Sequence, residues 1–205
     1  MEKRDLKKDL AHLYNPPKRC ELVQVPPLRF LMLDGHGNPN NNPVYQEAVE
    51  TLYALVYTLK FAVKKSVGLD YGVMPLEGLW SVPDMNQFSL EDKDAWDWTM
   101  MIMQPEWISP EMVESASAEV RRKKKLLALE QVRFEVYDEG LAAQIMYLGA
   151  YADEGPAIAM LHTFIAEQGY ERRGKHHEIY LGDPRRTAPE KLKTVIRQPV
   201  KGAEG

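Results

Sequence analysis

A repeated order of secondary structure most constrains the fold of this chain. In the first half, a strand over residues 28–34 precedes a long helix that ends before Gly68, and strands over 72–82 and 95–103 follow. The second half repeats this order around one helix, with elements over residues 132–137, 141–148, 153–168, 175–181 and 194–200. Two strand-helix-strand-strand modules predict an α+β fold, in which an antiparallel sheet carries helices on one face. A ligand groove is expected where the modules meet.

Local motifs predict where several helices begin. Asn42 is placed to cap the long helix, and Pro43 suits its first turn. Residues 109–125 are expected to form a connecting helix with a basic end. Thr187 and Glu190 have the spacing of a capping box, which predicts a short helix before the last strand.

We expect these elements to form one domain over residues 26–200, with halves at about 28–105 and 130–200. An N-terminal extension over 1–25 and a tail over 201–205 are expected to be less ordered, because they lack a strong hydrophobic pattern. We assign no function to either segment.

Composition limits the classes of function. The chain has 205 residues, 44% of them hydrophobic, which suffices for the core of one large domain or two fused small ones. A formal net charge of −4 argues against general nucleic-acid binding. The basic run 121–125 is expected to be a solvated helix end.

The sequence predicts a cytoplasmic protein without a metal or cofactor. Cys20 is the single cysteine and no signal peptide is recognisable, which favours a reducing compartment, and no apolar run is long enough for a membrane span. His176 and His177 are adjacent on a strand, so their side chains point to opposite faces and cannot share a metal ion.

Glu178 is the strongest candidate site residue. It lies within a strand, where alternation puts His176, Glu178 and Tyr180 on one face. A carboxylate buried in a sheet costs several kcal/mol unless it is hydrogen-bonded, protonated or next to a cavity. The alternative is an edge strand on which Glu178 is solvated.

Other aromatic residues have more than one interpretation. Trp96 and Trp98 share a face of their expected strand with methionine, a pattern typical of a ligand wall but also of an ordinary core. Tyr53 and Tyr57 lie one helical turn apart, so they close over the groove, pack in the core or form a solvent-facing stripe.

Several motifs carry a resemblance to a known family. These motifs cover residues 29–37, 75–80, 147–151, 177–181 and 192–200, and together they resemble the gyrase-inhibitor-like (GyrI-like) small-molecule-binding domain family. The resemblance extends from Leu28 to Val200. It implies a pseudo-twofold pair of the modules described above, with a ligand cleft at their junction.

The resemblance also implies the chemistry of the cleft. Relatives use a glutamate matching Glu178 to meet cationic, aromatic ligands, and aromatic rings resembling Trp80, Tyr147 and Tyr180 surround it. Relatives often have histidine where this chain has Tyr147. Some members sense effectors in transcription regulators with an upstream DNA-binding module, but only about two dozen residues precede the first strand here. We therefore expect a free-standing binding protein or enzyme.

Three functions follow as hypotheses. The first is polyspecific binding of hydrophobic, aromatic and often cationic small molecules, with drug resistance by sequestration. The second is a detoxifying hydrolase that opens the cyclopropane ring of DNA-alkylating natural products, with Glu178 as general base and Tyr147 or Tyr180 bonded to the substrate carbonyl. Cys20 has no recognisable histidine partner and is not expected to be catalytic. The third is a protein partner in the same groove.

Overall fold

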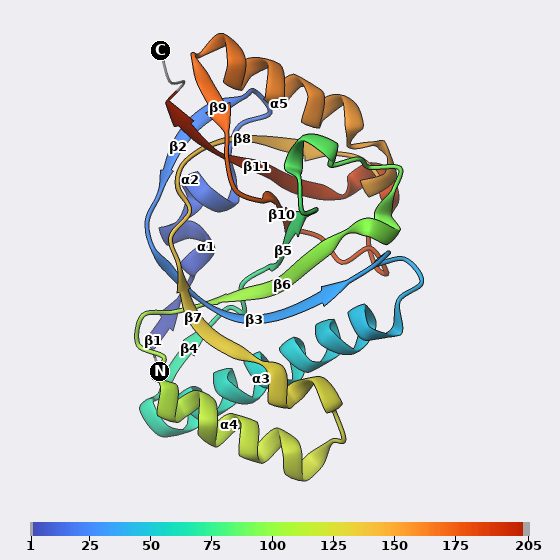
Figure 1. Ribbon diagram of the computed structural model, residues 1–205. Coiled ribbons are helices and arrows are strands. Elements are labelled where there is room, and N and C mark those ends of the chain that lie inside the picture. The colour runs from blue at the N-terminus through green and yellow to red at the C-terminus, as the bar shows by residue number, and fades with distance from the viewer. Residues whose placement is uncertain (1, 203–205) are drawn as a thin grey trace.

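The computed structural model describes residues 2–202 and shows a curled main sheet flanked by helices, with a separate two-stranded sheet (Figure 1). The helices are α1 (Leu6–Asp9), α2 (Ala11–Tyr14), α3 (Pro43–Val67), α4 (Pro110–Lys123) and α5 (Gly155–Glu167). The first strands are β1 (Glu2–Arg4), β2 (Glu21–Val25), β3 (Leu28–His36), β4 (Leu69–Tyr71), β5 (Leu76–Ser81) and β6 (Asp97–Gln104). The remaining strands are β7 (Arg133–Tyr137), β8 (Gly140–Leu148), β9 (Tyr170–Arg172), β10 (His176–Tyr180) and β11 (Lys193–Gly202).

Nine strands of the described chain form the main sheet. The order is β2-β8-β11-β10-β5-β6-β3-β7, with β9 paired to β11, and every pairing is antiparallel. The two modules appear as β3-α3-β5-β6 and β8-α5-β10-β11, and they meet where β5 pairs with β10. The α+β class, the paired modules and the antiparallel sheet are therefore confirmed.

Helix α3 begins and ends where the sequence predicts. The Asn42 side chain accepts a hydrogen bond from the Val44 backbone N–H, and Gly68 ends the helix in the left-handed conformation at φ 71°. The buried side chains of Leu52, Leu55 and Leu59 pack the helix against the sheet. None of the helices in residues 2–202 is long and apolar enough to cross a membrane.

Two expectations about the ends of the chain were wrong. The expected capping box at Thr187 does not form: the short helix is a 3₁₀ turn over Pro189–Lys191, and its cap position is Ala188, which makes no side-chain cap bond. The N-terminal segment, expected to be less ordered, places Leu13 and Tyr14 in the core with 0% and 4% exposure. Residues 203–205 of the expected tail lie outside the described part of the chain.

A buried charged cluster explains the position of the N-terminal segment. His177 Nδ1 donates to Glu139 at 2.8 Å, and His177 Nε2 donates to Glu77 at 2.9 Å. Arg197 Nη1 donates to Glu139 at 3.1 Å, which balances two carboxylates with two cations. Tyr14 donates its hydroxyl proton to Glu77 at 2.7 Å. The sheet face opposite α3 and α5 thus holds the N-terminal segment through charge-assisted hydrogen bonds.

Backbone carbonyls of the N-terminal segment complete this attachment. Arg197 Nη2 donates to the Leu13 carbonyl, and Gln144 Nε2 donates to the His12 carbonyl, each at 2.7 Å. Strand β2 then joins the sheet edge by pairing with β8. The sequence before the first module therefore forms part of the fold.

The cluster fixes the protonation of its members. Burial alone lowers the pKa of His177, but the charge of Glu139 and the bonds to Glu139 and Glu77 raise it to about 9. Burial alone raises the pKa of Glu139, yet His177 and Arg197 lower it to about 2. His177 is therefore an imidazolium that bridges two carboxylates at neutral pH.

We predict a pH-dependent stabilisation by His177. Because its folded pKa is raised, its contribution is complete below about pH 6.5 and is lost as the pH rises through about 9. The difference in the free energy of unfolding between the wild type and His177→Gln should be largest near pH 6 and shrink towards pH 9, as measured by urea unfolding. The exposed His36→Gln variant serves as the control. A difference that stays constant from pH 6 to 9 would contradict the assignment.

Candidate functional site

Glu178 lies at the junction of the two modules. In the sheet it stands opposite Gly78 of β5 and Ile196 of β11, so β10 is an interior strand and the edge-strand alternative is excluded. Glu178 is 7% exposed. His176 Nε2 donates to its Oε1 at 3.0 Å, and the Tyr180 hydroxyl donates to its Oε2 at 2.7 Å. The three side chains share one face, as strand alternation predicts.

These two donors keep Glu178 ionised. Burial alone raises its pKa, but the hydrogen bonds from His176 and Tyr180 hold the pKa below its usual range. The same burial and the Glu178 charge raise the pKa of Tyr180 well above its usual value. Glu178 is thus a buried anion, and Tyr180 remains a hydrogen-bond donor to it.

A second buried carboxyl group, Glu154, lies close to Glu178. Glu154 directly precedes α5 and is 3% exposed. Burial and then the negative charge of Glu178 raise the pKa of Glu154 to about 9, so it is protonated at neutral pH. Two neighbouring carboxyl groups with opposite shifts are typical of an acid and base pair.

Aromatic rings surround the carboxyl groups. Trp80 Nε1 donates to the Tyr180 hydroxyl at 3.1 Å, and the Trp80 ring stacks on Tyr45 with centroids 6.2 Å apart. Trp96 lies 5.1 Å from Trp80, and Tyr151 lies edge-on to Tyr180 at 5.2 Å. Gly78 makes room, since a Cβ there would lie 2.9 Å from Trp80 Nε1.

Residues 83–96, here named the cover segment, lie over this aromatic group. They connect β5 to β6 through 3₁₀ turns over Met85–Gln87 and Lys93–Ala95. The Phe88 ring stacks on Trp96 at 5.1 Å and lies 5.7 Å from His176. Lys93 Nζ lies 5.3 Å above the Trp96 ring. Its charge adds to the lowering of the Glu178 pKa and opposes, without cancelling, the rise in the Glu154 pKa. Protein side chains therefore fill the space above Glu178.

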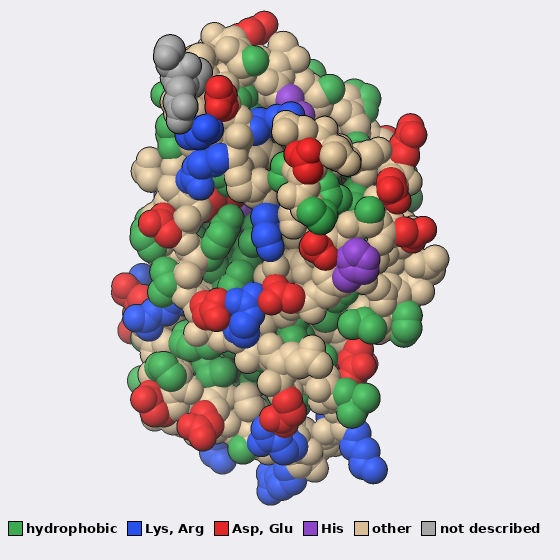
Figure 2. All heavy atoms as spheres, viewed as in Figure 1, with side chains coloured by type: hydrophobic (Ala, Val, Ile, Leu, Met, Phe, Trp, Pro, Cys, Tyr) green, Lys and Arg blue, Asp and Glu red, His purple; other side chains and the backbone are tan. Residues whose placement is uncertain are grey.

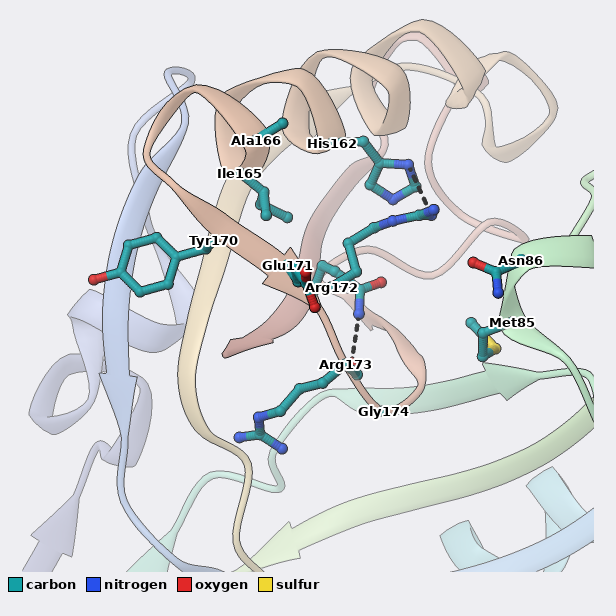
Figure 3. A pocket seen from close by; sticks show the side chains of 11 residues that line it. Met85, Asn86, His162, Ile165, Ala166, Tyr170, Glu171, Arg172, Arg173 and Gly174 are labelled. Atoms are coloured by element: carbon teal, nitrogen blue, oxygen red, sulfur yellow. Dashed lines mark hydrogen bonds between the residues drawn. The ribbon is translucent and has the colours of Figure 1, made fainter. Parts of the chain in front are cut away.

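An open pocket of about 480 Å³ lies beside the cover segment (Figure 3). Met85 and Asn86 form one wall, and His162 of α5 points towards Arg172 on the other side. Arg172 Nη1 lies 3.3 Å from His162 Nδ1. His162 Nε2 and His176 Nδ1 are both buried without a hydrogen-bond partner in the described chain. Of these two histidines, His176 is the one that the Phe88 ring contacts.

The structure separates the other predicted aromatic residues. Trp98 is 1% exposed, donates from Nε1 to the Gly37 carbonyl at 3.2 Å and packs on Gly35. Its ring lies edge-on to Tyr45 at 5.3 Å, so Trp98 is a core residue behind the aromatic group. Tyr147 lies on β8, two strands from Glu178, and donates to the Ala150 carbonyl at 3.1 Å. Tyr147 is thus not a direct neighbour of Glu178, but it lies on the same sheet face as Tyr180, with Thr194 of β11 between them. Burial and then the charges of Asp153 and Glu154 raise its pKa.

Tyr53 and Tyr57 belong to an aromatic row on α3. Their centroids lie 6.3 Å apart, and Phe61 continues the row at 6.4 Å from Tyr57. Tyr57 is 46% exposed and Phe61 is 59% exposed, whereas Tyr53 is half-buried. The solvent-facing stripe therefore describes Tyr57 better than a place over Glu178. Within residues 2–202, no cluster of three or more His, Cys, Asp or Glu side chains has metal-binding geometry.

We predict that one glutamate carboxyl group titrates near pH 9. The raised pKa of Glu154 should appear as a side-chain ¹³C carboxyl resonance that changes with a midpoint at about pH 9. This resonance should be absent in Glu154→Gln and present in Glu190→Gln, which alters an exposed glutamate. Titration of every wild-type glutamate below pH 6 would contradict the pairing.

Comparison with known proteins identifies the fold family. The profile of the GyrI-like small molecule binding domain matches residues 19–201. An uncharacterized conserved protein from Listeria innocua is 37% identical with a TM-score of 0.89, and the match covers 96% of this chain and 99% of that chain. A structure described as a hydrolase from Listeria innocua is 37% identical with a TM-score of 0.86, covering 98% of this chain and 100% of that chain.

More distant structures share the fold alone. The EcmrR C-terminal domain is 13% identical with a TM-score of 0.56, covering 90% of this chain and 98% of that chain. No curated protein matches the chain.

Proposed function

The chain belongs to the GyrI-like small-molecule-binding domain family, and we propose that it binds hydrophobic, aromatic, often cationic small molecules at Glu178. The observation that carries the proposal is a buried, ionised carboxylate surrounded by aromatic rings. Trp80, Trp96 and Tyr180 present ring surfaces next to Glu178 without a rigid set of directional contacts. Such surfaces suit many planar ligands rather than one metabolite.

Charge supports the preference for cations. An ionised Glu178 attracts a delocalised cation by direct charge, and each desolvated cation–π contact adds about 0.5 to 2 kcal/mol. Lys93 already occupies a place of this kind, because its ammonium lies above Trp96 and acts on both carboxyl groups. A cationic ligand would take over the electrostatic role of Lys93.

The cover segment must move for a ligand to reach Glu178. Phe88 lies between Trp96 and His176, so its departure exposes a ring face and the unpartnered His176 Nδ1 together. Only 3₁₀ turns and bends structure this segment, and segments of this kind open at a lower free energy than sheet strands. Movement of Phe88 is thus part of the proposed binding reaction.

The Glu154–Glu178 pair favours hydrolysis as a second candidate function. Glu178 would accept a proton from water, whose oxygen bonds to a cyclopropane carbon, while the electrons of the broken C–C bond move to a conjugated carbonyl. Tyr180 or protonated Glu154 would donate to the carbonyl oxygen. A Listeria innocua protein 37% identical to this chain is described as a hydrolase. The substrate class proposed is the cyclopropane-bearing DNA alkylators.

We predict that binding at Glu178 depends on ligand charge. N-methylacridinium and acridine at pH 8 have the same ring shape, but only the first is a cation. Glu178→Gln should weaken N-methylacridinium by about tenfold or more, because one buried ion pair is lost, and should leave acridine nearly unchanged. Fluorescence titration measures both affinities, and the exposed Glu190→Gln is the control. Equal affinities of wild type and Glu178→Gln for the cation would refute the binding proposal.

Hydrolysis predicts turnover that depends on both carboxyl groups. Incubation with a cyclopropane-bearing alkylator should yield a product heavier by one water, detected by mass spectrometry. Glu178→Gln should abolish product formation, because the base is removed. Glu154→Gln should slow product formation by roughly 10²-fold or more, because the acid is removed. Recovery of bound but unchanged compound from the wild type would reject hydrolysis and leave the binding proposal standing.

A further inference from the structure

The face of the sheet opposite Glu178 contains a second open hollow. Its volume is about 870 Å³, within the range of small-molecule sites. The floor includes Met32, Leu79 and Thr99 from three adjacent strands, all less than 5% exposed. One wall is β7, and the other is the connection between β9 and β10. Figure 2 views this face, where acidic and basic side chains alternate in a row across its middle.

The cation of the β7 wall already has carboxylate partners. Arg133 Nη2 donates to both oxygens of Asp34, at 2.8 and 2.9 Å, and Arg133 Nη1 donates to Glu135. Thr99 donates its hydroxyl proton to Asp34 at 2.6 Å. This wall therefore has no cation left for a ligand anion.

The opposite wall has cations without carboxylate partners. Arg173 donates to the carbonyls of Val200 and Glu139, and Lys175 Nζ donates only to Thr99 Oγ1 at a long 3.4 Å. Within residues 2–202 neither forms an ion pair, although Glu171, four residues before Lys175, pairs with Lys201. Both side chains are half-buried and line the hollow. Burial removes part of the water around such a cation, and no carboxylate compensates its charge. An anionic ligand would therefore be stabilised beside it.

We propose that this hollow binds a small organic carboxylate with an apolar body. Lys175 and Arg173 would hold the carboxylate through charge-assisted hydrogen bonds, and the apolar body would lie on Met32 and Leu79. The hydroxyl of Ser81 lies on the same face of the hollow and offers a further hydrogen bond.

The hollow and the Glu178 site are separate. Strand alternation places Lys175 on the same side as His177, whereas Glu178 points to the side covered by α5. The charged groups that would meet a ligand also differ in sign: Lys175 and Arg173 on one wall of the hollow are cations without carboxylate partners, whereas Glu178 is an anion. A carboxylate therefore suits that wall of the hollow, and a cation suits the Glu178 site. The two ligands should therefore bind without competing.

The test is to titrate the full chain with 2-naphthoate and to measure binding by isothermal titration calorimetry and by amide NMR. We expect saturable binding that shifts the Lys175 and Thr99 resonances. Lys175→Met should weaken it by about tenfold, because one charge-assisted hydrogen bond is lost, and Lys175→Arg should retain it. Exposed Lys191→Met and the site variant Glu178→Gln should leave it unchanged.

Three outcomes would overturn the proposal. The first is no saturable binding of 2-naphthoate, and the second is equal affinity in wild type and Lys175→Met. The third is displacement of 2-naphthoate by equimolar inorganic phosphate, which would show an anion site without selectivity for an apolar carboxylate. Loss of N-methylacridinium binding in Glu178→Gln, with naphthoate binding intact, would show that the two sites are independent.

Discussion

The antiparallel pairing of β5 with β10 is the interaction on which the rest of the structure depends. It is the contact that joins the two modules within the sheet, and it sets Gly78 opposite Glu178. A glycine at this point lets Trp80 lie close to the strand and reach Tyr180. Without this pairing, Trp80 of β5 would not lie next to Tyr180 and Glu178 of β10. The position of Glu178 at the junction of the two modules thus follows from sheet topology.

One strand serves two electrostatic environments because successive side chains point to opposite faces. His177 belongs to a nearly neutral cluster in which two carboxylates, an imidazolium and a guanidinium compensate one another. Glu178, the next residue, is an anion supported by His176 and Tyr180. The first arrangement contributes to the attachment of the N-terminal segment, and the second is a buried anion beside the aromatic rings. Separation by a single backbone strand keeps the two from neutralising each other.

Much of this architecture was predictable because it rests on periodicity. Alternation in β10 placed Glu178 with His176 and Tyr180, and helical spacing with a cap identified α3. Contacts between distant segments were not predictable in the same way. Glu154 lies in a connection before α5, where no periodic pattern marks burial, and Phe88 lies in an irregular segment. Their roles arise from tertiary packing.

For several other residues, tertiary packing decided what the sequence pattern left open. Trp98 shares the face of its expected strand with Trp96, one of the candidates for a ligand wall. Because Gly35 has no Cβ, the Trp98 ring packs directly on the Gly35 backbone and is buried in the core. Tyr147 was assigned through resemblance, and the structure places it on the face of Tyr180 with Thr194 of β11 between the two. Tyr14 and Leu13 had no repeat to mark them, and only the buried cluster shows why they are buried.

The packing of Phe88 and Trp96 over the site has a thermodynamic consequence. The ring faces that Phe88 contacts are already shielded from water before a ligand binds. A ligand ring that takes the place of Phe88 there therefore releases no water from these faces. The negative heat-capacity change of binding should then reflect dehydration of the ligand far more than dehydration of the protein. Ligands of this site would thus bind with a weaker temperature dependence of enthalpy than their contact area alone suggests.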